Sequence, residues 1–114
     1  MNNRLCAAHL LTVSDAVRMG VAAGVDAETL IGALNAGSGR AGVSEVNFPR
    51  WILSGLFDSG FTMGLMRKDV GLAQTLAGDT GTSMPLLDVA ARLWRDSADA
   101  LGDDEDFNRI AALD

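Results

Sequence analysis

The stretch NRLCAAHLLTVSDAVRMGVAA, residues 3–23, is the longest helical pattern in the chain, and it decides the fold. Its apolar residues recur at helical intervals and fall on two sides of a helix. One side carries Leu5, Ala8, Leu11, Ala16 and Met19, and the other carries Leu10, Val13, Val17 and Val21. A helix that is apolar nearly all round is usually buried among other elements. We therefore expect this helix to run through the middle of a helical domain.

Shorter helical segments follow this long helix. We expect them over about 27–35, 44–53, 62–78, 85–101 and 104–112, with glycine-rich turns between them. Asp26 is a suitable N-cap for the first segment, and Ser83 for the fourth, in which Pro85 lies near the first turn. Pro49 indicates a bend or a restart within the second. No period-two strand pattern appears, so the sequence predicts an all-α fold of five to six helices packed around one long N-terminal helix.

The length and the cysteine count bound the class of protein. A chain of 114 residues is sufficient for one domain, residues 1–114, with a single core. The lone Cys6 cannot form a disulfide within the chain, so we expect a cytoplasmic protein. Asp15 and Arg18 interrupt the first apolar stretch, which we take as too short and too broken to cross a membrane. No signal-peptide pattern opens the chain.

The acidity of the chain is confined to its C-terminal end. The formal net charge is -6, and residues 96–114 alone carry seven acids and one arginine. An acidic stretch repels phosphate backbones, so we expect no nucleic-acid partner. The simpler explanation of this stretch is a solvated helix face with a cluster of capping carboxylates.

Lys68 is the only lysine in a chain with eight arginines. Two explanations stay open: chance, or a place that needs a compact ammonium rather than a guanidinium. If the helix that carries Lys68 reaches back to Phe61, one apolar stripe contains Phe61, Leu65, Lys68 and Leu72. The charged end of the lysine then either extends to the edge of this stripe or faces a water-filled cleft. Asp69 points about 100° away. It either pairs with an arginine of another helix or has a functional role.

Two polar pairs open the long helix. Asn2 and Asn3 can cap it, or, if the helix extends upstream, they are interior residues that hydrogen-bond a small polar ligand. Cys6 and His9 are three residues apart and could offer two metal ligands. Because no second cluster of Cys or His accompanies them, we expect no metal site.

The order of these motifs resembles the C-terminal domain of the β-hydroxyacid dehydrogenases, which include 3-hydroxyisobutyrate dehydrogenase. The matching pieces are Asn2-Asn3 before a long apolar helix, Ser38-Gly39-Arg40, Gly60-Phe61, and the run Lys68-Asp69-Val70-Gly71-Leu72-Ala73. The resemblance covers nearly the whole chain, and its most specific piece is the Phe-x6-Lys-Asp spacing. Thr75 departs from the family, which often has an acid at that position.

The resemblance implies a fold like the C-terminal domain of 6-phosphogluconate dehydrogenase and an NAD(P)-dependent oxidoreductase. It implies NAD or NADP as cofactor, a small 3-hydroxyacid or semialdehyde as substrate, and a homodimer or homotetramer without membrane partners. Asn2 and Asn3 would bind the substrate, and Phe61, Lys68 and Asp69 would lie on the cofactor side.

The same resemblance implies parts that this chain lacks. The family has an N-terminal Rossmann domain, and its catalytic lysine would fall two positions before Met1. No catalytic residue is therefore expected in this chain, which alone should be inactive. The alternative is an autonomous, noncatalytic helical module that self-associates through its long apolar helix.

Overall fold

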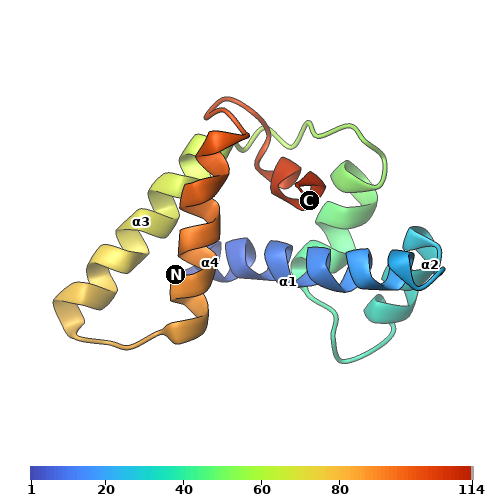
Figure 1. Ribbon diagram of the computed structural model, residues 1–114, viewed down its shortest axis with the longest axis horizontal. Helices are drawn as coiled ribbons and strands as arrows, with labels where there is room; N and C mark the ends of the chain where they lie inside the picture. The colour runs from blue at the N-terminus through green and yellow to red at the C-terminus, as the bar shows by residue number, and fades with distance from the viewer. Residues whose placement is uncertain (114) are drawn as a thin grey trace.

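The computed structural model describes residues 1–113, which are built of helices without a strand, as expected. The elements are α1 (Asn2–Ala22), α2 (Ala27–Asn35), the π-helix η1 (Val43–Ile52), α3 (Met63–Thr80), α4 (Pro85–Asp96) and the 3-10 helices η2 (Ser97–Asp99) and η3 (Phe107–Ala112). The helix α1 lies along the long axis of the molecule, with α3 and α4 at its N-terminal end and α2 at the other (Figure 1). It contacts α2, α3, α4, η1 and η3, so it is the central element.

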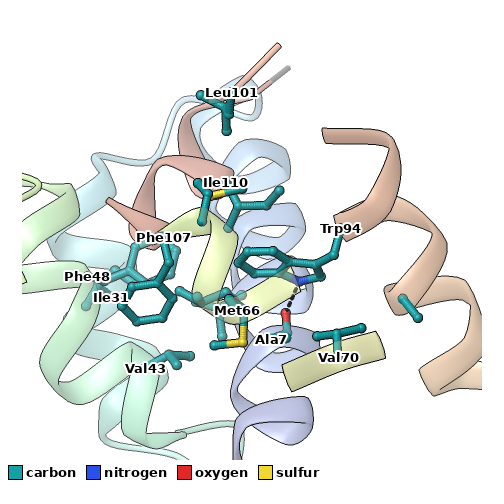
Figure 2. Packing of buried hydrophobic residues seen from close by; sticks show 14 residues of the cluster. Ala7, Ile31, Val43, Phe48, Met66, Val70, Trp94, Leu101, Phe107 and Ile110 are labelled. Atoms are coloured by element: carbon teal, nitrogen blue, oxygen red, sulfur yellow. Dashed lines mark hydrogen bonds between the residues drawn. The ribbon is translucent and has the colours of Figure 1, made fainter. Parts of the chain in front are cut away.

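The core forms along one side of α1. Ala7 and Leu10 are fully buried there, and Trp94 of α4, which is 0% exposed, packs across them. The indole N–H of Trp94 donates a hydrogen bond of 3.0 Å to the carbonyl oxygen of Ala7 (Figure 2). Met66 of α3 and Phe107 of η3 belong to the same cluster of buried hydrophobic residues. This contact ties α4 to the first half of α1.

The other side of α1 is exposed, contrary to the expectation of burial nearly all round. Met19 is 73% exposed and Val21 49%, because no other element covers this side within residues 1–113. The expectation that the segment is too short and too broken for a membrane helix was also wrong. α1 has 21 residues and contains an 18-residue window with a mean hydropathy of 1.2, so by length and composition alone it could span a bilayer. Core helices meet the same criterion, and the buried side of α1 packs against its neighbours.

The helix α4 ends earlier than expected, at Asp96, and a 3-10 turn follows it. The hydroxyl of Ser97 donates to the carbonyl oxygen of Trp94 and competes with the helical hydrogen-bond pattern there. Ser83 is not the N-cap that the sequence suggested. Met84 occupies that position, without a capping side-chain hydrogen bond.

The two remaining elements also differ from the regular helices that the sequence predicted. Pro49 lies inside η1, and the N–H of Leu53 reaches back five residues to the carbonyl oxygen of Phe48 at 2.8 Å. Because proline has no N–H, this segment cannot complete a regular α-helical ladder. The last helix begins at Phe107, not 104, because Asp106 caps it by accepting from the backbone N–H of Asn108.

Local caps place α2 and α3 close to their expected positions. The Asp26 carboxylate accepts from the backbone N–H of Thr29 at 3.2 Å, which confirms the predicted start of α2. Thr62 caps α3 in the same way, accepting from the N–H of Leu65 at 3.2 Å. Gly81 ends α3 in the left-handed conformation, with φ of 67°, which glycine adopts without strain.

Candidate functional site

The side chains of Asn3 and Asp69 meet where the start of α1 lies against the middle of α3. The Nδ2 group of Asn3 donates a hydrogen bond of 2.6 Å to Oδ2 of Asp69, across 66 positions of sequence. A carboxylate only accepts, so the amide N–H group must face Asp69, and the amide oxygen points away from it. Hydrogen bonds to an ionised group are short and strong. The alternative that Asp69 pairs with an arginine of another helix is therefore wrong.

Two grooves adjoin this hydrogen bond. The first, the α1–η1 groove, has a volume of about 610 Å³ and is lined by Asn2, Asn3, Leu5, Cys6, His9, Gly42, Val43, Val46, Asn47, Trp51, Ser59, Phe61, Met66 and Phe107. The second, the α1–α3 groove, has a volume of about 370 Å³ and is lined by Met1, Asn2, Asn3, Arg4, Asp69, Leu72, Ala73 and Leu76. Asn2 and Asn3 line both grooves, so the two amides stand at their junction.

Lys68 stands apart from this junction. It is exposed on α3, lines neither groove, and makes no ion pair or hydrogen bond within residues 1–113. Its neighbours along the helix, Leu65 and Leu72, are 49% and 60% exposed, so the mixed apolar and cationic stripe exists on α3. Phe61 does not belong to that stripe, because α3 begins only at Met63.

Phe61 instead faces the α1–η1 groove, and a network around Asp106 holds it there. The Asp106 carboxylate accepts hydrogen bonds from Ser59 and Asn108, and the N–H of Phe107 donates to the Phe61 carbonyl oxygen at 2.9 Å. The rings of Phe61 and Phe107 are 5.2 Å apart. Partial burial alone would raise the pKa of Asp106, but these hydrogen bonds outweigh it and lower the pKa. The capping explanation of the acidic stretch is thus confirmed for this carboxylate.

The structure adds groove residues that the sequence did not single out as a set. Trp51 and Asn47 reach the α1–η1 groove from η1, and Cys6 and His9 reach it from α1. Burial raises the pKa of the Cys6 thiol, which therefore stays neutral. Residues 1–113 contain no group of three or more His, Cys, Asp or Glu side chains placed to hold a metal. Helical spacing in the sequence could show that Cys6 and His9 share one face of their helix, and that Asn47 and Trp51 share one face of theirs. It could not show that the two helices face each other across a groove.

Arg4 is the other residue that sequence reasoning missed. Its side chain is 2% exposed, and its Nη2 group lies 3.3 Å from Oδ1 of Asp88 on α4. The Nε and Nη1 groups of Arg4 are buried without a hydrogen-bond partner in the described chain. A guanidinium with two unsatisfied donors is costly to bury. The burial of these two donors therefore offsets the stability that the ion pair between Arg4 and Asp88 contributes.

Comparison with known proteins agrees with this architecture. Residues 1–113 match the family described as NAD-binding of NADP-dependent 3-hydroxyisobutyrate dehydrogenase. The chain is 34% identical over 100 residues to the mitochondrial 3-hydroxyisobutyrate dehydrogenase of Rattus norvegicus, covering 82% of this chain and 30% of that protein. It is 30% identical over 94 residues to 2-(hydroxymethyl)glutarate dehydrogenase of Eubacterium barkeri, covering 82% and 31%.

A solved structure shows the same fold. The Mycobacterium tuberculosis 3-hydroxyisobutyrate dehydrogenase with L-serine matches with a TM-score of 0.83 at 26% identity, over 97% of this chain and 40% of that one. The chain thus spans less than half the length of the proteins it matches. The family description names NAD binding, which confirms the expected nicotinamide cofactor at the level of the family. The chain belongs to the 3-hydroxyisobutyrate dehydrogenase family, of which it matches the NAD-binding helical domain.

Proposed function

We propose that this chain forms one wall of the active-site cleft of an NAD(P)-dependent 3-hydroxyacid dehydrogenase, and part of its subunit interface. The enzyme would oxidise a primary alcohol to an aldehyde, for which a bound nicotinamide would supply the hydride acceptor and the upstream catalytic lysine would take the hydroxyl proton. The hydrogen bond between Asn3 and Asp69 carries this proposal, because it joins the asparagine pair to the Lys68-Asp69 run, the most specific piece of the resemblance, at the junction of two grooves.

In this function Asn3 binds the substrate, and Asp69 orients the amide group of Asn3. One amide N–H of Asn3 is engaged by Asp69, which leaves the second N–H and the amide oxygen for a ligand. The oxygen can accept from the substrate hydroxyl, and the N–H can donate to its carboxylate. Asn2 lines both grooves beside it and offers a second amide. Asp69 is a positioning residue, since it acts through Asn3.

The exposed stripe on α3 fits a nicotinamide cofactor. Lys68 offers an ammonium to an anionic group, and the exposed Leu65 and Leu72 offer an apolar surface to a planar ring. When bound, the nicotinamide accepts the hydride. We assign Phe61 and Lys68 to the cofactor side, with the substrate carboxylate as the other possible partner of Lys68. The Rossmann domain and the catalytic lysine belong, in this proposal, to a chain segment preceding Met1, and the 114 residues alone are inactive.

A noncatalytic self-association module is the second candidate. Exposed apolar side chains on α1 and α4, such as Met19 at 73% and Leu86 at 84%, favour an interface between copies of the chain. In the proposed dehydrogenase these surfaces would form the contact between subunits, so the two candidates differ in catalysis and not in assembly.

Activity of the two-domain protein tests the proposal. We expect the chain joined to its upstream domain to oxidise 3-hydroxyisobutyrate, followed by the absorbance of NAD(P)H. Asn3→Ala should lower kcat/KM by about 10²-fold, as the loss of an essential hydrogen-bonding group does. Asp79→Ala, which removes an exposed acid near the end of α3, is the control and should leave kcat/KM unchanged. A folded Asn3→Ala enzyme with full activity would exclude the assigned role, and an inactive two-domain protein would favour the self-association module.

A further inference from the structure

The substrates named for the similar proteins share one half and differ in the other. The names 3-hydroxyisobutyrate, 2-(hydroxymethyl)glutarate and L-serine all describe a CH2OH group on the carbon that bears a carboxylate. The third substituent on that carbon is a methyl group, a carboxyethyl group or an ammonium group. In the proposed function, Asn3 and the cofactor bind the CH2OH group and the carboxylate, which all these substrates share. Selectivity among the substrates therefore depends on the surface that contacts the third substituent.

Of the two grooves that Asn3 lines, the α1–η1 groove is the larger, and Arg4 and Asp69 line only the other one. The lining of the α1–η1 groove, which lies entirely within the described residues, includes no Asp, Glu, Lys or Arg. Leu5 and Val46 are 49% and 46% exposed beside Trp51, so apolar surface is available to a ligand. The Cys6 thiol stays neutral, because burial raises its pKa. His9 alone could carry a charge, and it is exposed.

Desolvation decides which substituent this lining accepts. An ammonium or a second carboxylate loses its hydration in an apolar groove, and no opposite charge on the lining replaces it. An apolar group gains by leaving water, at about 0.8 kcal/mol for each CH2 buried, which corresponds to about fourfold. A groove of about 610 Å³ is far larger than a methyl group and lies within the range of small-molecule sites.

We propose that the α1–η1 groove binds the third substituent and selects 2-substituted 3-hydroxypropanoates in which that substituent is uncharged, apolar and larger than methyl. This inference rests on the proposed dehydrogenase function. The selected substrate class differs from L-serine by charge and from 3-hydroxyisobutyrate by size.

A substrate panel on the two-domain holoenzyme tests the proposal. The compounds are 2-benzyl-3-hydroxypropanoate, 3-hydroxyisobutyrate, L-serine and 2-(hydroxymethyl)glutarate, all assayed at the same pH. We expect kcat/KM for the benzyl compound to exceed that for 3-hydroxyisobutyrate by at least about tenfold. The two compounds with a charged third substituent should be the poorest. A preference for L-serine or for the glutarate, or equal rates for benzyl and methyl, would overturn the proposal while leaving the dehydrogenase function intact.

A charge introduced into the groove should change this preference. Val46→Glu places a carboxylate on an exposed position of the lining, so it should raise the ratio of kcat/KM for L-serine over 3-hydroxyisobutyrate by about fivefold, the effect of one partly exposed ion pair. Val25→Glu adds the same charge in the turn between α1 and α2, outside the groove, and should leave the ratio unchanged. An equal ratio in both variants would show that the groove does not meet the substituent.

Binding of the same compounds to the 114-residue chain distinguishes a failure of the groove assignment from a failure of the dehydrogenase function. Its two indole N–H groups give two NMR signals, one from Trp51 in the groove and one from Trp94, which is 0% exposed. We expect 2-benzyl-3-hydroxypropanoate to shift only the Trp51 signal and L-serine to shift neither. If no compound is oxidised but this shift is seen, the dehydrogenase function fails and the groove assignment stands. An unshifted Trp51 signal overturns the groove assignment.

Discussion

The contact between Asn3 and Asp69 predicts that these two residues are energetically coupled, although 66 positions separate them. The perturbation is a double-mutant cycle made of Asn3→Ala, Asp69→Ala and the double variant, all in the 114-residue chain. Each single variant removes the 2.6 Å hydrogen bond, so the second substitution should cost less in the presence of the first.

The expected coupling energy follows from the chemistry and the burial of the pair. A hydrogen bond to a charged group contributes about 1.5–3 kcal/mol to stability. Both side chains are only partly buried, so water competes for the carboxylate and screens its charge. We therefore expect a coupling of about 1–1.5 kcal/mol. With a urea m value of about 1.5 kcal/mol/M, this shifts the unfolding midpoint by about 0.7–1 M.

Urea unfolding followed by tryptophan fluorescence measures all four free energies of unfolding. Asp79→Ala is the matched control, because Asp79 is an exposed acid on α3 without a side-chain hydrogen bond in the described chain. Its free energy of unfolding should change by no more than about 0.5 kcal/mol, and its coupling to Asn3→Ala should be near zero. A coupling between Asn3 and Asp69 below about 0.5 kcal/mol, the level at which distant sites are additive, would refute the positioning role of Asp69.

Three further predictions concern glycine, acid and a buried arginine. Gly71→Ala should stabilise α3 by about 0.5–1 kcal/mol, because a Cβ there meets open space. Gly64→Ala should destabilise the protein by about 1–3 kcal/mol, because its Cβ would lie 2.9 Å from the Cβ of Asp103. Thermal unfolding of both variants measures whether the two changes have opposite signs. The lowered pKa of Asp106 means that its contribution to stability is complete above the unfolded value of about 3.9 and is lost as the pH falls through the lower folded value. Urea midpoints between about pH 6 and pH 3 should therefore fall more steeply in the wild-type chain than in Asp106→Asn, and parallel profiles would contradict this. Arg4→Met should leave the free energy of unfolding unchanged or raise it by up to about 2 kcal/mol, because the two unsatisfied donors disappear. Asp88→Ala should instead lower it by about 1–2 kcal/mol, because it leaves the buried guanidinium without its carboxylate, and equal destabilisation by both variants would refute this account.

The local elements of this protein were readable from the sequence, because local chemistry decides them. Helical spacing located α1, α2 and α3 to within about two residues, the usual uncertainty of helix ends. Asp26 was identified as a cap because its carboxylate reaches a backbone N–H only three residues away. The motif order also led to the family, which the match over residues 1–113 confirms.

Irregular elements were not readable, because tertiary contacts outweigh propensity in them. The helix predicted to continue to residue 101 stops at Asp96, where Ser97 bonds the preceding turn and also accepts from Arg67 of α3. The final helix is a 3-10 helix that begins at Phe107, since the Asp106 carboxylate is shared between the cap and Ser59. Arg67 is 30 positions from Ser97, and Ser59 is 47 positions from Asp106, so neither contact could be read from the local sequence.

The sequence by itself determined which residues of the candidate site to examine, and the tertiary structure decided how they are combined. The amides at Asn2 and Asn3, the lone Lys68 and the neighbouring Asp69 stand out as residue types in a pattern. Only the packing of α3 against α1 places Asp69 on Asn3 and leaves Lys68 exposed. Adjacent residues on a helix point about 100° apart, so the rotation of α3 in the core selects which of the two meets the amide. That rotation is set by the burial of residues such as Met66 and Val70 against α1 and α4, and therefore by the whole fold.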